Sequence, residues 1–308
     1  MMTSTVHMTE GERLRALFAE ERRSVGIVAP FIKVDALRSL LNALDANVHV
    51  RCTTRWRPRE VAAGVSDPEI LEVLEERGNS TLSVVDELHA KLYFAGDRCL
   101  AGSANVTRAG FGESAGGGNI EVLVETSTTD PFVAATLARI GEVERPASRA
   151  MADTVRRLAD ILVTSPRPVA DLKARWLPLS RRPDRAYRQY CTPSVDFMSS
   201  ADRLLLEDVA MANVPAGLDE EDFRESVRRL LAEIPLGARL LESEEDAVVT
   251  REELSEELRG LARQAGSCFT AEDVWRAFVE WITHFFPDRL MKQEIAEVGL
   301  RRAQVLDQ

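Results

Sequence analysis

The stretch 88–112 contains side chains that could act together on a phosphate ester. His89 and Lys91 are two residues apart, and Ser103 and Asn105 repeat this spacing. Residues two apart in an extended strand share a face, so each pair can point to one side of a sheet. An imidazole is a competent nucleophile near neutral pH, while an ammonium, a hydroxyl and a carboxamide can hold phosphate oxygens. Nothing in this set binds a metal well, so we expect chemistry without a metal or a cofactor.

The two pairs of residues meet only if the chain between them folds back as a hairpin. A shared face requires His89 to lie opposite Asn105 and Lys91 opposite Ser103. That register predicts a three-residue turn centred on Asp97. Asp97 is then a structural turn residue without a part in the chemistry, since aspartate is common in such turns.

These residues resemble the signature of the phospholipase D superfamily, which reads H-x-K, an aspartate several residues later, and G-S-x-N. The matching positions are His89, Lys91, Gly102, Ser103 and Asn105. The family aspartate lies one residue closer to the lysine, where this chain has Gly96, so Asp97 stands in a hairpin that is one residue shorter. The resemblance covers roughly residues 20–143 and is closest to the nuclease branch, which includes metal-independent restriction endonucleases.

The resemblance implies a mechanism with two histidines. His89 of one subunit attacks phosphorus to form a phosphohistidine, the equivalent histidine of a second copy protonates the leaving oxygen, and water hydrolyses the intermediate. It also implies an acidic residue on the following strand that orients the histidine. Glu121 fits that role, although it also fits an exposed strand carboxylate. The chain has four histidines, and only His89 stands in H-x-K. One chain therefore supplies half a site, and we expect a homodimer.

Three arginines are candidates for binding the substrate. Arg55 and Arg57 follow a predicted strand, at the end where α/β sheets usually bind ligands, and Arg108 lies just beyond Asn105. All three are also compatible with solvated loops. A histidine at a strand start can be structural as well, but H-x-K, G-S-x-N and a downstream N-x-E together favour an active site at His89.

The elements that would position these residues alternate between strands and helices. The pattern predicts strands at 24–32, 47–54, 80–86 and 120–126, and helices at 34–44, 67–79 and 131–140. With the hairpin, this order predicts an α/β fold, a phospholipase-D-like mixed sheet flanked by helices. Residues 1–148 should form this catalytic domain.

Beyond residue 148 the apolar residues recur at helical spacing. We expect 149–308 to be a mostly α-helical C-terminal domain, with a proline- and arginine-rich linker at 165–190. The basic and aromatic residues of that linker could instead hold single-stranded nucleic acid by charge and stacking. The helical domain is also a candidate site for a protein partner.

Charge and cysteine content limit the class of protein. In 308 residues the net charge is −11, so nucleic acid would need a local basic groove rather than bulk attraction. Four scattered cysteines predict neither a zinc site nor a disulfide framework. The sequence contains no secretory leader and no membrane-spanning run, so we expect a cytoplasmic protein that does not bind a membrane.

These features predict a nuclease that cleaves DNA in preference to RNA, and family analogy suggests restriction or phage defence. Two alternatives stay open. A phospholipid phosphodiesterase would use the same chemistry, although the acidic charge and the lack of a basic amphipathic helix disfavour it. A binding or scaffold module would hold nucleic acid without cleaving it, and the intact His89 and Lys91 disfavour that alternative.

Overall fold

The computed structural model describes residues 8–114, 118–165, 176–192, 199–242, 248–293 and 299–302. The chain divides into two compact units between Val155 and Arg156. This division falls within helix α6 (Arg149–Thr164). Residues 166–175, which include the first part of the predicted linker, lie outside the described residues.

The first unit is built on a sheet of seven strands in the order β6-β5-β4-β1-β2-β3-β7. Its strands are β1 (Ser24–Val28), β2 (His49–Thr54), β3 (Ser80–Val84), β4 (Leu92–Ala95), β5 (Arg98–Gly102), β6 (Leu123–Ser127) and β7 (Arg145–Pro146). Strands β1, β2 and β3 are parallel neighbours, and the other pairs are antiparallel. The predicted fold class, a mixed sheet flanked by helices and followed by a mostly helical part, is confirmed.

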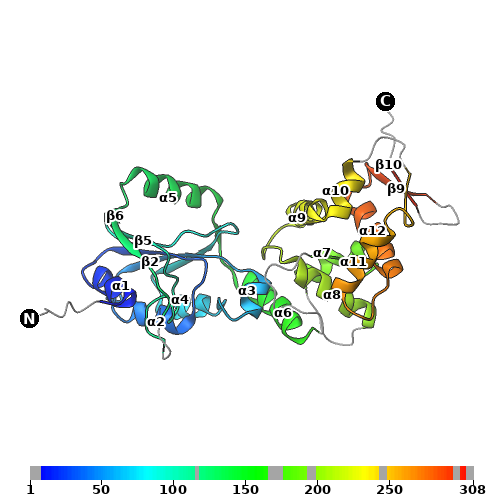
Figure 1. Ribbon diagram of the computed structural model, residues 1–308. Coiled ribbons are helices and arrows are strands. Elements are labelled where there is room, and N and C mark those ends of the chain that lie inside the picture. Colours follow the sequence, from blue (N-terminus) through cyan, green and yellow to red (C-terminus); the bar gives the residue numbers. More distant parts are fainter. Residues whose placement is uncertain are drawn as a thin grey trace, which may run out of the picture. The chain divides into compact units, whose positions relative to one another are not determined.

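Helices cover both faces of this sheet (Figure 1). They are α1 (Glu10–Ala19), α2 (Val34–Leu41), α3 (Pro58–Ala62), α4 (Ile70–Arg77) and α5 (Pro131–Val143). Figure 1 shows α1, α2 and α4 on one face and α5 on the other. Helix α5 places Val133 and Ile140 in one apolar cluster with Leu88 and Leu92. The core therefore supports the chain on both sides of His89.

The hairpin between β4 and β5 has a two-residue turn made of Gly96 and Asp97, since Ala95 pairs with Arg98. The predicted three-residue turn is therefore wrong. Gly96 has a φ of 58°, in the left-handed region that glycine adopts without strain. Glycine with positive φ at the first turn position suits a two-residue hairpin, because its twist matches that of the strands.

The change of register alters which residues face each other. Lys91 lies opposite Gly102, whose N–H donates to the Lys91 carbonyl at 3.1 Å. The paired strand ends at Gly102, so Ser103 and Asn105 lie in the loop beyond it. The predicted pairs of His89 with Asn105 and of Lys91 with Ser103 are not formed across the hairpin.

The second unit is mostly helical. Its helices are η1 (Pro183–Arg185), α7 (Ala186–Cys191), α8 (Ser200–Ala212), α9 (Glu220–Glu233), α10 (Pro235–Glu242), α11 (Ser255–Ala265) and α12 (Ala271–Phe285). Three short strands, β8 (Val248–Thr250), β9 (Leu290–Gln293) and β10 (Gly299–Arg302), form an antiparallel sheet in the order β8-β10-β9. Within the described ranges, every helix lacks the combination of length and apolar character needed to cross a bilayer.

Residues 176–190, expected to belong to a linker, instead pack into the second unit. Trp176 is 6% exposed, and its indole N–H donates to the carbonyl of Asp208 at 2.9 Å. Tyr190 is 2% exposed and lies 4.8 Å from the ring of Phe223, between centroids. Burial of large aromatic surface outweighs the proline and arginine content of this segment. These two rings are therefore not available to stack on bases.

The chain from α10 to β10 has the connectivity of a winged helix, with a strand before the helix pair, two strands after it, and β10 between β8 and β9. In helix-turn-helix proteins the second helix of the pair enters a DNA groove. Here that helix is α12, and it buries Trp275, Phe278 and Trp281. Its one exposed residue is Arg276, which pairs with the half-buried Glu272, and Glu280 is half-buried as well. This helix is largely buried and has more acidic than basic residues, so the arrangement gives no support to DNA binding by α12.

Candidate active site

The predicted site lies at the edge of the sheet where the parallel strands β1, β2 and β3 end. Residues 85–91 lead from β3 to β4 and carry His89 and Lys91. Because β4 is antiparallel to β1, the start of β4, the end of β5 and the start of β6 all lie at this edge. Ser103 follows β5 and Glu121 precedes β6, so their backbones reach the same edge, where α/β sheets usually bind ligands.

His89 and Lys91 are in direct contact. The Lys91 ammonium donates to the backbone carbonyl of His89 at 2.7 Å, and its Nζ lies 3.5 Å from His89 Nδ1. His89 is exposed, whereas Lys91 is 8% exposed. The imidazole is thus accessible to a substrate while the cation beside it is held in place, as a nucleophile and an oxyanion stabiliser need to be.

The pKa of Lys91 is lowered from its ordinary value of 10.5. Burial is the main cause because it disfavours the charged amine, and the positive charge of Arg55 acts in the same direction. The carboxylate of Glu121 opposes both by favouring the ammonium. Glu121 and Arg55 therefore both lie close enough to Lys91 to influence its charge.

Ser103 and Glu121 form the second contact of the site. The Ser103 hydroxyl donates to Glu121 Oε2 and accepts the backbone N–H of Val122 at 3.0 Å. The amide of Asn119 donates to the other carboxylate oxygen of Glu121 at 3.1 Å. Strand β6 begins later than predicted, at Leu123, so Glu121 is a loop residue. Among the described contacts, its carboxylate accepts hydrogen bonds from Ser103 and Asn119. Its role in orienting His89 stays a prediction.

Hydrogen bonds hold the loop on either side of Asn105. The Tyr93 hydroxyl donates to the carbonyl of Ala104 at 2.6 Å, and the N–H of Val106 donates to the carbonyl of Phe31 at 3.1 Å. Within the described part of the chain, Asn105 Oδ1 is buried and has no hydrogen-bond partner. Part of the hydrogen-bonding capacity of this side chain is therefore unused within one chain.

Arg55 and Arg57 are candidates for contacting the substrate. In the structure, both form hydrogen bonds to other groups of the protein. Arg55 binds the carboxylate of Glu60 and donates to the carbonyl of Leu88 at 2.8 Å. Arg57 donates to the carbonyl of Asp86, also at 2.8 Å. Both arginines thus hold the backbone just before His89. The sequence did not indicate Glu60 as part of the site, because the pattern of a short helix does not show which residue a carboxylate will bind.

Arg108 remains accessible to a substrate. Its side chain is 67% exposed, and its Nε is 2.5 Å from a carboxylate oxygen of Asp35. Loop 105–108 runs beside loop 31–33, since Ile32 and Val106 form an isolated bridge. Arg108 is therefore near the loops of the site edge, and its role in binding phosphate stays a prediction.

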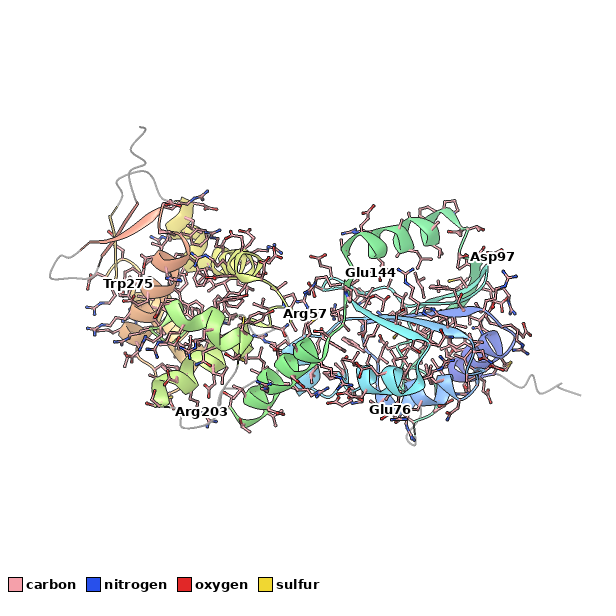
Figure 2. The ribbon with its side chains drawn as sticks, turned by 180° about the vertical axis from the view of Figure 1, so that it is seen from behind. Arg57, Glu76, Asp97, Glu144, Arg203 and Trp275 are labelled. Atoms are coloured by element: carbon pink, nitrogen blue, oxygen red, sulfur yellow. The ribbon has the colours of Figure 1, made fainter. Side chains whose placement is uncertain are left out.

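Asp97 lies far from these residues. Figure 2 shows Asp97 and Arg57 at opposite ends of the sheet. The first is in the hairpin turn and the second follows β2, at the edge that carries His89. This position fits a turn residue.

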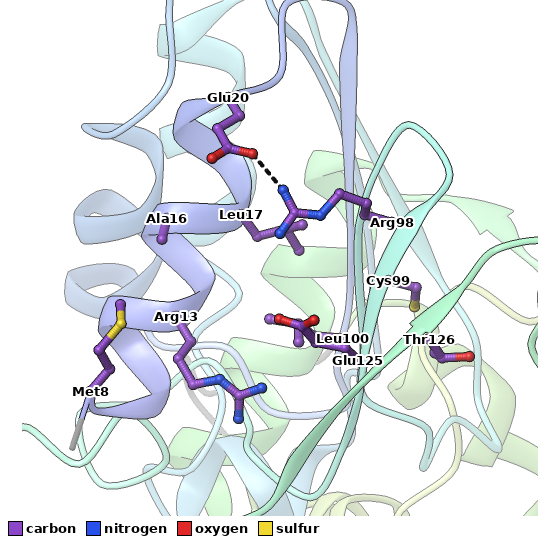
Figure 3. Close-up of a pocket in the computed structure, with 10 residues that line it drawn as sticks. All are labelled: Met8, Arg13, Ala16, Leu17, Glu20, Arg98, Cys99, Leu100, Glu125 and Thr126. Carbon is purple, nitrogen blue, oxygen red and sulfur yellow. Dashed lines mark hydrogen bonds and ion pairs between the residues drawn. The ribbon is translucent and has the colours of Figure 1, made fainter. Parts of the chain in front are cut away.

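A cavity of about 220 Å³ lies between α1, β5 and β6 (Figure 3). Arg13, Arg98 and Glu125 line it, and Arg98 pairs there with Glu20 at 2.5 Å. None of the predicted site residues lines this cavity.

Comparisons with known proteins give similarity to solved structures alone. No family model and no curated protein sequence matches the chain. NucT from Helicobacter pylori is 15% identical, and the match covers 42% of this chain and 84% of that one with a TM-score of 0.33. Nuc from Salmonella typhimurium, a phospholipase D family member, is 16% identical, with 44% and 88% covered and a TM-score of 0.33. TrmBL2, an archaeal chromatin protein, is 13% identical, with 46% and 54% covered and a TM-score of 0.27. The Salmonella protein belongs to the family that the sequence motif resembles.

Proposed function

We propose that this protein is a metal-independent phosphodiesterase, a nuclease that acts on DNA through a phosphohistidine. One observation carries the proposal. The exposed imidazole of His89 stands beside the buried ammonium of Lys91, with 3.5 Å between Nδ1 and Nζ. A nucleophile beside a fixed cation is what attack on a phosphodiester requires, because negative charge builds on the phosphate oxygens as the new bond forms.

The reaction proceeds in two displacements. The imidazole of His89 forms a bond to phosphorus, the bond from phosphorus to one ester oxygen breaks, and the His89 of the partner copy gives that oxygen a proton. Water then attacks the phosphohistidine, with the partner imidazole taking its proton, and His89 is released. Lys91 and Ser103 offer donors to the nonbridging oxygens.

Attack through Nε2 sets a condition on the ring. A neutral imidazole carries one proton, and Nε2 is nucleophilic only when that proton is on Nδ1. An acceptor must then face Nδ1, and an ammonium cannot serve. We assign this role to Glu121, whose charge already acts on Lys91. The Glu121 carboxylate would exchange its contact with Ser103 for one with His89 when a substrate occupies the hydroxyl.

The second histidine comes from a second copy of the chain. His89 is the one histidine in an H-x-K, so a single chain holds half of the catalytic pair. Strand β6 is at the edge of the sheet. Val122, just before this strand, and Val124, within it, are each 57% exposed. An exposed apolar edge strand is typical of a surface that another chain covers. We assign this edge to the partner copy.

DNA is the substrate that we favour over RNA, with Arg108 as its exposed phosphate contact. A role in restriction or phage defence, a cytoplasmic location and a protein partner for residues 149–308 belong to the same proposal. The alternatives, a phospholipid phosphodiesterase and a binding or scaffold module, are separated from it by the choice of substrate and by the presence of turnover.

A single assay tests the proposal. Purified protein is incubated with single- and double-stranded DNA, RNA and phospholipid vesicles in excess chelator. We expect cleavage of DNA, and a loss of more than about 1000-fold in His89→Ala with an unchanged melting temperature, since His89 is exposed. Undiminished cleavage by His89→Ala would overturn the nuclease mechanism. Turnover of vesicles without DNA cleavage would favour the lipid alternative, and tight binding without any turnover would favour the scaffold.

A further inference from the structure

The segment that carries the proposed nucleophile is not part of a strand. Residues 85–91 connect β3 to β4, and two backbone hydrogen bonds mark its start, from Val85 to the carbonyl of Thr54 at 2.9 Å and from Leu88 to the carbonyl of Val85 at 3.2 Å. A regular ladder therefore does not fix the direction of His89. Other contacts must do so, because a nucleophile displaced by about 1 Å loses roughly 100-fold in rate.

Arg55 supplies the contact nearest to His89 in sequence. Its Nη1 donates to the carbonyl of Leu88 at 2.8 Å, while Nε and Nη2 bind the two carboxylate oxygens of Glu60 at 3.1 and 2.5 Å. The guanidinium lies 5.4 Å from the centre of the Phe31 ring. The side chains of Arg55 and Glu60 are 14% and 10% exposed. A guanidinium held on three sides in this way has one orientation.

A second set of contacts holds the same segment at Asp86. Arg145 binds both carboxylate oxygens of Asp86 at 2.9 Å, and Arg57 donates to the Asp86 carbonyl at 2.8 Å. Burial raises the pKa of Asp86, and the charge of Arg145 opposes that rise. Arg55 and Arg57 thus bind the backbone of this segment and hold it against the rest of the unit. The charge of Arg55 also acts on the pKa of Lys91.

We propose that Arg55, held by Glu60, is a positioning residue for the His89–Lys91 segment and is not a contact to the substrate. The inference rests on the proposed nuclease function. Arg55 fixes the carbonyl of Leu88 and so the direction of His89. Glu60 holds the guanidinium in the orientation that reaches Leu88.

The first test separates positioning from substrate contact by kinetics. Arg55→Gln, Arg55→Lys and Glu60→Gln are compared with the wild type on a DNA oligonucleotide, and Arg38→Gln, which removes an exposed ion pair to Glu76, is the matched control. Positioning predicts that kcat falls by about 10- to 100-fold with little change in KM in Arg55→Gln and in Glu60→Gln. A carboxylate does not attract phosphate, so a fall of kcat in Glu60→Gln is not explained by lost binding. A raised KM with unchanged kcat in Arg55→Gln would overturn the proposal, as would full activity of Glu60→Gln.

The second test does not depend on cleavage. The pKa of the Lys91 amine is measured without substrate by pulse labelling with an amine-reactive reagent across pH, followed by mass spectrometry. We expect this pKa to rise in Arg55→Gln, because a nearby positive charge is removed, and to stay near the wild-type value in Arg55→Lys, which keeps the charge. An equal rise in both variants would show that the Arg55 charge does not act on Lys91 and that the segment has loosened.

The results distinguish failure of the nuclease function from failure of the positioning role. If the wild type cleaves no nucleic acid, the nuclease function fails, and the titration of Lys91 still decides whether Arg55 acts on it. If cleavage occurs and Arg55→Gln behaves like Arg38→Gln, the positioning role fails while the nuclease function stands. If Arg55→Gln does not fold, Arg55→Lys still tests it: loss of the forked contact should lower kcat, and unchanged kcat would overturn the proposal.

Discussion

At the scale of single residues, the site depends on charges that act on each other over short distances. Lys91 is buried, and the positive charge of Arg55 and the negative charge of Glu121 act on its pKa in opposite directions. His89 is exposed and touches the Lys91 ammonium through Nδ1. The charges of these side chains therefore act on the proposed nucleophile and on the cation proposed to bind the phosphate.

The lowered pKa of Lys91 has a consequence for substrate binding. A lysine with a lowered pKa loses its proton, and with it the attraction for phosphate, at a lower pH than 10.5. We expect KM for DNA to begin to rise with pH below that value. In Lys91→Arg the cation stays charged, so the rise should disappear. Steady-state kinetics across pH check this, and an equal rise in both proteins would exclude Lys91 as its cause.

Removal of the Glu121 charge should weaken the nucleophile. In Glu121→Gln we expect kcat to fall by about 10- to 100-fold, because the carboxylate no longer holds the proton of Nδ1. Glu125→Gln, at an exposed position of β6, is the control. Equal effects of the two substitutions would count against a role for Glu121 at His89.

At the scale of elements, close contact between β5 and β6 brings Ser103 to Glu121. The last paired residue of β5 is Gly102, opposite Leu123. A Cβ on Gly102 would overlap the backbone carbonyl of Val122. The N–H of Ser103 donates to that same carbonyl at 3.0 Å. Glycine is therefore required here by the approach of two backbones, and the matched G of the G-S-x-N motif has a structural role.

Gly102→Ala tests this packing. The overlap should destabilise the protein by about 1–3 kcal/mol and lower activity, because β6 must move away and take Glu121 with it. Gly141→Ala is the control, since a Cβ there meets nothing within 4 Å and the residue lies in α5. Alanine in a helix should stabilise by about 0.5–1 kcal/mol. Urea unfolding measures both, and an undisturbed Gly102→Ala protein would contradict the close approach.

At the scale of the whole molecule, the proposed chemistry needs two chains, because each chain has one histidine in an H-x-K. Wild-type protein should sediment as a dimer. Activity per wild-type chain should fall as His89→Ala chains are mixed in, since a mixed dimer lacks one of the two histidines. Unchanged activity per wild-type chain after subunit exchange would show that one histidine suffices.

The proposed dimer surface has its own test. Val124 is 57% exposed, so an aspartate at this position should not disturb the core. In Val124→Asp we expect more monomer and less activity at equal concentration, because a charge at an apolar contact disfavours association. A Val124→Asp protein that remains dimeric and active would place the contact elsewhere on the chain.

Much of the fold follows from local patterns in the sequence. Apolar runs and helical spacing predict the alternation of strands and helices in the first unit and the helical character of the second, because burial of one face depends on residue spacing alone. The short spacing between His89 and Lys91 likewise keeps the two residues close, and an extended backbone puts their side chains on one side. Their contact at 3.5 Å involves residues two apart in the sequence.

Other features did not follow from the sequence patterns. A turn of two residues instead of three shifted the register of the hairpin, because one glycine with positive φ decides which residues pair. The sequence left Arg55 and Arg57 as candidates for substrate contacts or for solvated loops, and the structure adds their hydrogen bonds to the carbonyls of Leu88 and Asp86. The sequence by itself determined which chemical groups the protein has and which neighbours share an element. Only the tertiary structure decided which charges are buried and which are already bound, because those depend on residues far apart in the chain.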